Sequence, residues 1–375
     1  MAHTRGSQTT LVLAAASLLP TLAGAQTAAE PVTQRSAPAE TTAAAYVDKN
    51  WRAPRTSWGH PSLEGVWNTD DLRGVPMNRP AAQAGRESLT VEEFRQRAAN
   101  DDSGRDFTVN VGTFLRHEFG TRTFGYTSLI VDPPSGQMPA LTPAGEALAA
   151  TRTRGTFGAG PFDDFDDFSL YDRCITRGVL GSLLPVIYGN GLRIAQNPTA
   201  VAISYEMIHD TRIIPLDGRP ALDGGIRQYM GSARGRFEGD TLVVETTNFT
   251  AKTSIGVNGG GPPNSEQLKL TERFTRVDPQ MIEYVATVDD PGAYTAPFTL
   301  RLMITTRPGY EVLEYSCHEG NGAVSHALSG ERAYEQQVAE ARAKGLPTPA
   351  RAVEHEQIRN GPAEGTRVFD VNAGE

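Results

Sequence analysis

The second half of the chain alternates hydrophobic and polar residues with a period of two, which is the pattern of half-buried β-strands. Segments rich in Val, Ile, Thr, Tyr and Phe are separated by Gly, Pro, Asn or Asp, and two separators, Glu238-Gly239-Asp240 and Asp278-Pro279-Gln280, suit tight turns. We predict strands over residues 192–196, 200–216, 235–249, 268–277, 281–288, 298–305 and 311–317.

Consecutive strands without helices between them favour an antiparallel sheet that closes on itself, because closure removes exposed edges. We therefore expect a mainly β fold, an antiparallel up-and-down barrel with a few short peripheral helices. Short strands are also expected near 63–69 and 127–131. Helices are predicted after a capping box of Thr90 and Glu93, after Thr142-Pro143, and over Glu331–Lys344.

The first twenty-five residues have the parts of a secretory signal peptide. Arg5 gives a positive start, Leu11–Ala25 is apolar, and Ala23-Gly24-Ala25 places small residues before Gln26. We expect cleavage after Ala25 and a periplasmic or secreted protein. No membrane span is expected, since no later stretch reaches the roughly 20 apolar residues of a membrane helix.

Differences in composition divide the rest of the chain into a linker, one domain and a tail. Residues 26–45 are rich in Ala, Thr and Pro and are predicted to form a disordered linker. Residues 46–346 are expected to form a single β-barrel-type domain with N-terminal decoration, followed by a loose polar tail over 347–375. The formal net charge of −9 argues against nucleic acid as a partner, because binding to phosphate backbones needs a basic surface.

Familiar catalytic motifs are missing from the sequence. It contains no G-x-S-x-G elbow, no H-E-x-x-H pair and no G-x-G-x-x-G after a strand, so hydrolase, zinc and dinucleotide chemistry are not indicated. We expect neither a cofactor nor a metal. In an oxidising compartment the two cysteines, Cys174 and Cys317, favour a disulfide. The alternative is two buried thiols that pack as small hydrophobic groups.

Three motifs between Asp172 and Phe249 carry a resemblance: DRCITRG, YEMIHDTRIIPLDGRP and GRFEGDTLVVETTNF. They resemble a family of exported bacterial proteins of unknown function over about Trp67–Gly330, which implies no particular activity. The triplet Gly65-x-Trp67 and the later strands also resemble lipocalin-like barrels. That resemblance implies a small apolar ligand, and some such barrels are hydratases or isomerases. The second, arginine-bearing motif of the lipocalin-like barrels has no match in this sequence.

His209 and Tyr205 are the first candidate site residues. Alternation over Val201–Ile213 places both on the apolar, inward face of one strand. A histidine inside the barrel would act as a general acid or base, with Tyr205 as hydrogen-bond donor. The alternatives are a histidine bonded to a backbone carbonyl or one at the rim facing water.

Charged residues near the cysteines form a second candidate. If the disulfide forms, Arg173 and Arg177 lie close to Glu314 and His318, with Asp172 beside them. The two arginines would then bind a carboxylate or a developing oxyanion. A buried salt-bridge cluster around the disulfide is the alternative.

The third candidate is the acidic run Asp163–Asp167. Calcium binding and a solvated loop are both open, although the run lacks the glycine and distal glutamate of an EF-hand. Phe165 and Phe168 within and beside it would line the barrel mouth and bind ligand.

Together these features predict an exported barrel that binds a small, mostly apolar molecule, aromatic or terpenoid-like. We expect cofactor-free proton transfer on it, as in a lyase, hydratase or isomerase. The alternative function is a non-catalytic periplasmic ligand carrier. A scaffold that contacts other envelope proteins would be favoured by an interior packed with side chains.

Overall fold

The computed structural model describes residues 50–72, 74–103, 122–151, 161–186, 188–256, 261–306 and 308–350. These residues all belong to one compact unit of the chain, Ala37–Glu375. The predicted signal peptide and linker lie outside the described residues, and so does the predicted tail beyond residue 350.

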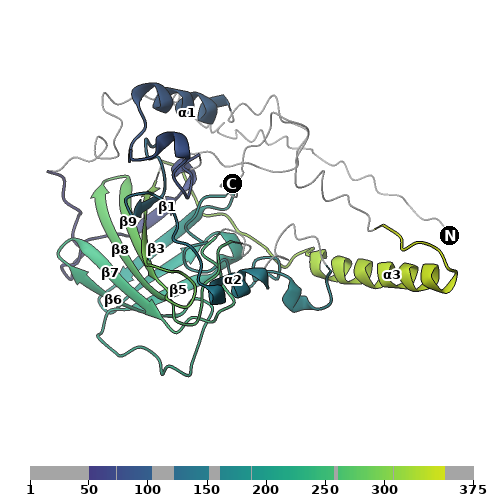
Figure 1. Cartoon of the computed structure of the whole chain (residues 1–375). Coiled ribbons are helices and arrows are strands. Elements are labelled where there is room, and N and C mark those ends of the chain that lie inside the picture. The colour runs from purple at the N-terminus through teal and green to yellow at the C-terminus, as the bar shows by residue number, and fades with distance from the viewer. Residues whose placement is uncertain are drawn as a thin grey trace, which may run out of the picture. The chain divides into compact units, whose positions relative to one another are not determined.

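Ten strands form one sheet in which paired neighbours run antiparallel, so the predicted mainly β class is confirmed (Figure 1). The pairing order is β5-β4-β3-β1-β10-β9-β8-β7-β6, and β2 pairs with β10 outside this path. The strands are β1 (Gly65–Asn68), β2 (Ile130–Asp132), β3 (Gly191–Asn197), β4 (Ala200–Tyr205), β5 (Thr211–Pro215), β6 (Ser232–Glu238), β7 (Thr241–Thr247), β8 (Lys269–Asp278), β9 (Met281–Asp289) and β10 (Phe298–Thr305).

The sheet does not close into a barrel, which corrects the predicted closed meander. Strands β5 and β6 end the pairing path on either side and lie beside each other without pairing. Gly235 of β6 permits their close approach, because a Cβ at this position would lie 2.7 Å from Ile214 Cγ2. The order is also not a simple up-and-down one, since β1 inserts between β3 and β10.

Two of the predicted strands differ in the structure. The segment 200–216 is divided into β4 and β5 by a turn that contains the short 3-10 helix η5 (Met207–His209). The segment 311–317 forms no strand. The predicted turns at Glu238-Gly239-Asp240 and Asp278-Pro279-Gln280 join β6 to β7 and β8 to β9.

Three α-helices lie outside the sheet path: α1 (Val91–Ser103), α2 (Pro143–Ala150) and α3 (Ala323–Ala343). The capping box forms as predicted, with the Glu93 amide donating to Thr90 Oγ1 over 3.2 Å and the Thr90 amide to Glu93 Oε2 over 2.7 Å. Thr142 caps α2 through a bond from the Gly145 amide. None of the described helices is both long and apolar enough to cross a bilayer. Further 3-10 turns are η2 (Asp70–Leu72), η3 (Ala81–Gln83) and η4 (Phe165–Asp167).

The interior of the curved sheet is filled by side chains from its own strands. Trp67 is 1% exposed, its Nε1 donates to the Leu63 carbonyl, and the Arg276 guanidinium lies 5.1 Å from its ring centroid. The expected hollow centre is therefore occupied by a hydrophobic core. Its largest fully buried members include Trp67, Tyr284, Phe124, Phe249, Phe274 and Phe298.

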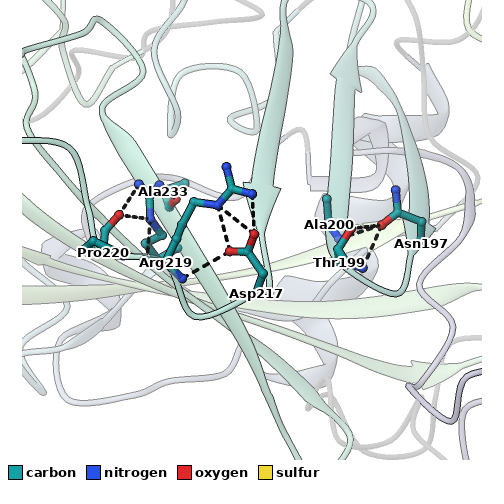
Figure 2. A network of polar contacts seen from close by, with 8 residues as sticks. Asn197, Thr199, Ala200, Asp217, Arg219, Pro220 and Ala233 are labelled. Carbon is teal, nitrogen blue, oxygen red and sulfur yellow. Dashed lines mark hydrogen bonds and ion pairs between the residues drawn. The ribbon is translucent and has the colours of Figure 1, made fainter.

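Polar residues at one end of the sheet close its turns (Figure 2). Asn197 Oδ1 accepts from the amides of Thr199 and Ala200, each over 2.8 Å, and so fixes the turn between β3 and β4. After β5, the Arg219 side chain donates to Asp217. These polar groups are thus engaged in hydrogen bonds within the chain's own turns.

Candidate functional site

A disulfide joins Cys174 to Cys317, as predicted. The two cysteines are 143 residues apart in sequence, and their Cα atoms are 5.6 Å apart. Cys174 belongs to the irregular segment that precedes β3, and Cys317 to the irregular segment between β10 and α3. The bond therefore brings two segments without regular structure together beside the sheet.

Three tyrosines gather at this junction, and we call Tyr171, Tyr188 and Tyr315 the tyrosine cluster. The hydroxyls of Tyr171 and Tyr315 are 3.4 Å apart. The rings of Tyr188 and Tyr315 lie within 22° of parallel, with centroids 6.3 Å apart. All three side chains are half-buried, so the cluster reaches the surface. They pack on the buried residues Val186, Met207 and Ile208.

Arg177 is buried next to the tyrosine cluster. The residue is 3% exposed, its Nη2 donates to the Leu184 carbonyl over 3.2 Å, and its Nε has no hydrogen-bond partner. No ion pair joins it to a carboxylate of the described residues; its electrostatic neighbours are the three tyrosine hydroxyls. Burial lowers the pKa of Arg177 to about 10, so the guanidinium remains charged at neutral pH. Buried charges in proteins are normally paired, and this one is not.

The tyrosine hydroxyls complete the polar surface next to this cation. Burial raises the pKa of Tyr171, and burial also raises that of Tyr315. Both hydroxyls therefore remain protonated at neutral pH and can donate hydrogen bonds. A buried cation beside protonated hydroxyls is an environment that favours a negatively charged group.

His209 is exposed, which corrects the prediction that it faces the sheet interior. The expected alternation fails because β4 ends at Tyr205 and the chain turns before β5. The ring nevertheless belongs to the candidate site, since its Nδ1 is 3.0 Å from the Tyr315 carbonyl oxygen. A carbonyl only accepts, so Nδ1 donates this hydrogen bond and Nε2 is the ring nitrogen that it leaves unused.

Backbone strain concentrates at the same place. Of the four non-glycine residues with positive φ in the described chain, three are Cys174 (56°), Ile208 (67°) and His209 (49°). The conformation is unfavourable for a β-branched residue such as Ile208. Each such residue costs about 1–3 kcal/mol, and strained residues tend to cluster at functional sites.

The Arg173 side chain binds the loop that carries the acidic run, not Glu314 or His318. Arg173 pairs with Asp166 and lies over the Phe165 ring, 5.3 Å from its centroid. Asp172 accepts from the Ser169 hydroxyl over 2.7 Å. Phe168 stacks on Phe162 with centroids 4.6 Å apart. The predicted convergence of Arg173 with the segment around Cys317 is therefore not seen; Arg173 stabilises the loop that carries the acidic run.

The acidic run is engaged with the protein's own groups. Asp163 pairs with Arg332, and Asp166 pairs with Arg173 and Lys252. The backbone amides of Asp163 and Asp164 donate to Asp167 Oδ2. Within the described residues, no group of three or more His, Cys, Asp or Glu side chains is placed to hold a metal ion.

Glu314 and His318 are both exposed. Glu314 accepts from the Ser316 hydroxyl over 3.1 Å. Further along the same segment, Asn321 Nδ2 donates to the Asp172 carbonyl over 3.0 Å and lies 3.2 Å from Cys174 Sγ, both in the other disulfide-linked segment. Asn321 thus holds the two segments together, whereas Glu314 and His318 lie on the water-facing side of their segment.

Tyr205 lies apart from His209, inside the sheet. The Tyr205 side chain faces a buried polar cluster that the sequence motifs did not reveal. In this cluster Arg212 pairs with Glu272 and also donates to Thr246 Oγ1. The Tyr284 hydroxyl donates to Glu272 over 3.1 Å, while the Tyr205 hydroxyl has no partner. A sequence signal for this group exists: Glu272 stands between the inward residues Leu270 and Phe274 of β8.

Compared with known protein families, with curated proteins and with solved structures, the chain matches none. The two resemblances described from its motifs therefore stay predictions.

Proposed function

We propose that the protein binds a small, mostly apolar organic anion at the tyrosine cluster, with Arg177 as the charge that receives it. The observation that carries this proposal is the buried guanidinium with an unpartnered Nε and no carboxylate partner among the described residues. An anion placed there would supply the missing partner, and a hydrogen bond from a buried charged donor is among the strongest in proteins.

The apolar part of the ligand would lie on the exposed hydrophobic residues that flank the two cysteines. Ile175 directly follows Cys174 and is 37% exposed, and Leu313 lies two residues before Tyr315 and is 47% exposed. The apolar part of a ligand that lies on these side chains would remove their hydrophobic surface from water. The packed interior leaves no room for a ligand inside the sheet, so the proposed ligand lies at the surface, and its chemical type stays the one that the sequence suggested. A packed interior is also the feature expected of a scaffold that contacts other envelope proteins, and failure of every anion to bind in the test below would favour that function.

His209 supports a second candidate function, acid–base chemistry on the bound molecule. Its Nδ1 is held by the Tyr315 carbonyl, so that Nε2 of the neutral ring is available as a base beside the cluster. The left-handed backbone of Ile208 and His209 fixes the position of this ring at a cost in strain. A lyase, hydratase or isomerase would use such a base; a carrier would not need it.

Export is part of the proposal. A chain with a cleavable signal peptide would reach an oxidising compartment, where the disulfide that assembles the site is stable. In a reducing compartment the cysteines would separate and the tyrosine cluster with them.

Calorimetric titration with benzoate and hexanoate, using benzamide and hexanamide as neutral analogues, tests the proposal. The acids should bind and the amides should not. Arg177→Gln should weaken acid binding at least about thirtyfold, as expected for loss of a buried charged partner. The matched control is Arg79→Gln, because Arg79 is also 3% exposed but donates to Thr127 and the Pro134 carbonyl.

Equal affinity of the amides and the acids would contradict the proposal, and so would unchanged acid binding by folded Arg177→Gln protein. For the second candidate function, His209→Gln should leave affinity for the acids unchanged and remove turnover of any substrate identified. Turnover that persists in this variant would exclude His209 as the base.

A further inference from the structure

We infer that the anion recognised at Arg177 is a planar aromatic monocarboxylate, an inference that rests on the proposed function and names the ligand class for it. Three observations carry it: the charge available at the site, the number of donors, and the orientation of the tyrosine rings.

Charge balance selects a monoanion. Arg177 is the charged group of the site, and burial raises the pKa of the Tyr171 and Tyr315 hydroxyls beside it, so that these two stay protonated. One negative charge neutralises the buried guanidinium. A phosphate monoester, which carries close to two charges at neutral pH, would leave excess negative charge in a poorly solvated position.

The donors match the oxygens of a carboxylate. Arg177 Nε has an unused proton, and the hydroxyls of Tyr171 and Tyr315 are 3.4 Å apart at the same cluster. A carboxylate has two oxygens that accept several bonds in one plane, and guanidinium groups bind this arrangement well. The tyrosine hydroxyls would donate to whichever oxygen the guanidinium leaves open.

The ring geometry favours a flat ligand body. Tyr188 and Tyr315 have ring planes within 22° of parallel, and both rings are partly exposed. They present flat apolar faces in similar orientations next to the donor groups. Aromatic pairs gain energy beyond the burial of area, which an aliphatic ring of equal size does not.

The test compares four probes by calorimetry on the full mature chain at pH 7: benzoate, cyclohexanecarboxylate, phenyl phosphate and benzamide. We expect benzoate to bind about fivefold more tightly than cyclohexanecarboxylate, the order of an aromatic contact. Phenyl phosphate should bind more weakly than benzoate, and benzamide should show no binding.

Two variants distinguish the contribution of the Tyr188 ring from that of the Tyr315 hydroxyl. Tyr188→Leu should abolish the preference for benzoate over cyclohexanecarboxylate while both acids still bind. Tyr315→Phe keeps the ring and the fold but removes one donor, so it should weaken both acids to a similar extent. Tyr334→Leu on α3, outside the cluster, is the matched control and should change neither.

Equal affinity for the two acids, or tighter binding of phenyl phosphate, would overturn the inference and leave the proposed anion site intact. Absence of binding by every anion would instead refute the proposed function itself. A preference for benzoate that survives in Tyr188→Leu would show that the ring of Tyr188 does not recognise the ligand.

Discussion

Arg212 of β5 and Glu272 of β8 form an ion pair inside the sheet, where Arg212 Nη1 donates to Glu272 Oε1 over 2.8 Å. Their side chains are 3% and 0% exposed. Strands β5 and β8 are not neighbours in the pairing order, so this contact crosses the interior of the curved sheet. The pair therefore joins regions that backbone hydrogen bonds do not connect.

The first prediction concerns this pair. Arg212→Met should destabilise the protein by about 3–5 kcal/mol, because it leaves the Glu272 carboxylate buried without its partner. The double variant Arg212→Met/Glu272→Leu should recover most of that loss. Urea unfolding followed by circular dichroism measures both. A double variant as unstable as the single one would mean that the pair stabilises the fold by itself.

Tyr205 and Tyr284 should respond in opposite directions to loss of the hydroxyl. Tyr205→Phe removes a buried hydroxyl without a partner and should raise stability by about 1 kcal/mol. Tyr284→Phe removes the donor to Glu272 and should lower stability by about 1–3 kcal/mol. Thermal unfolding of the two variants beside the native chain checks the sign of each change. Destabilisation by Tyr205→Phe would indicate a partner for this hydroxyl.

Loss of the disulfide should affect stability and the site together. Cys174→Ser/Cys317→Ser should reduce the free energy of unfolding by about 2–5 kcal/mol, since the bond closes a long loop. Benzoate binding should fall as well, because Tyr315 is held beside Tyr171 by the neighbouring bridge. Destabilisation without any change in benzoate affinity would show that the tyrosine cluster assembles independently of the bond.

Alkaline pH should unfold the protein through its buried tyrosines. Burial raises the pKa of Tyr126, Tyr171 and Tyr205 above the usual value near 10. Above about pH 10 the unfolded chain releases these protons while the folded chain retains them, so the contribution to stability declines as pH rises. Absorbance at 295 nm should show a late group of tyrosines that ionises together with unfolding. Ionisation of all eleven tyrosines before unfolding would contradict this.

Local pattern was enough to predict most of the strands, two turns and two helix starts. Period-two alternation bounded by turn residues describes β8, β9 and β10 closely, and the cysteines paired as compartment and number suggested. These features depend on residues close in sequence or on a single choice of partner, which is why sequence reasoning reached them.

The prediction for His209 was wrong because it continued one alternation through residues 206–210, where the chain turns. The turn between β4 and β5 reverses which residues face inward, so Arg212 and Ile214 are buried while Ile213 is 56% exposed. A slip of one position exchanges the two faces of a strand. Alternation alone does not reveal a turn formed by Met207 and Ile208, two apolar residues that are themselves buried.

Sequence patterns also could not predict that Arg177 lies close to three tyrosines. Tyr171, Tyr188 and Tyr315 come from irregular segments, and their meeting follows from the fold as a whole. The sequence did suggest that Arg177 receives an anion near the disulfide; its lack of a carboxylate partner among the described residues is visible only in three dimensions.

The approach of β5 to β6 has a consequence for the behaviour of the protein in concentrated solution. A free strand edge recruits strands from other copies and so begins aggregation. Here each end strand covers the other, and the missing side chain at Gly235 lets them do so. We therefore expect the contact between β5 and β6 to hinder the addition of strands from other copies, although the two edges are not hydrogen-bonded to each other.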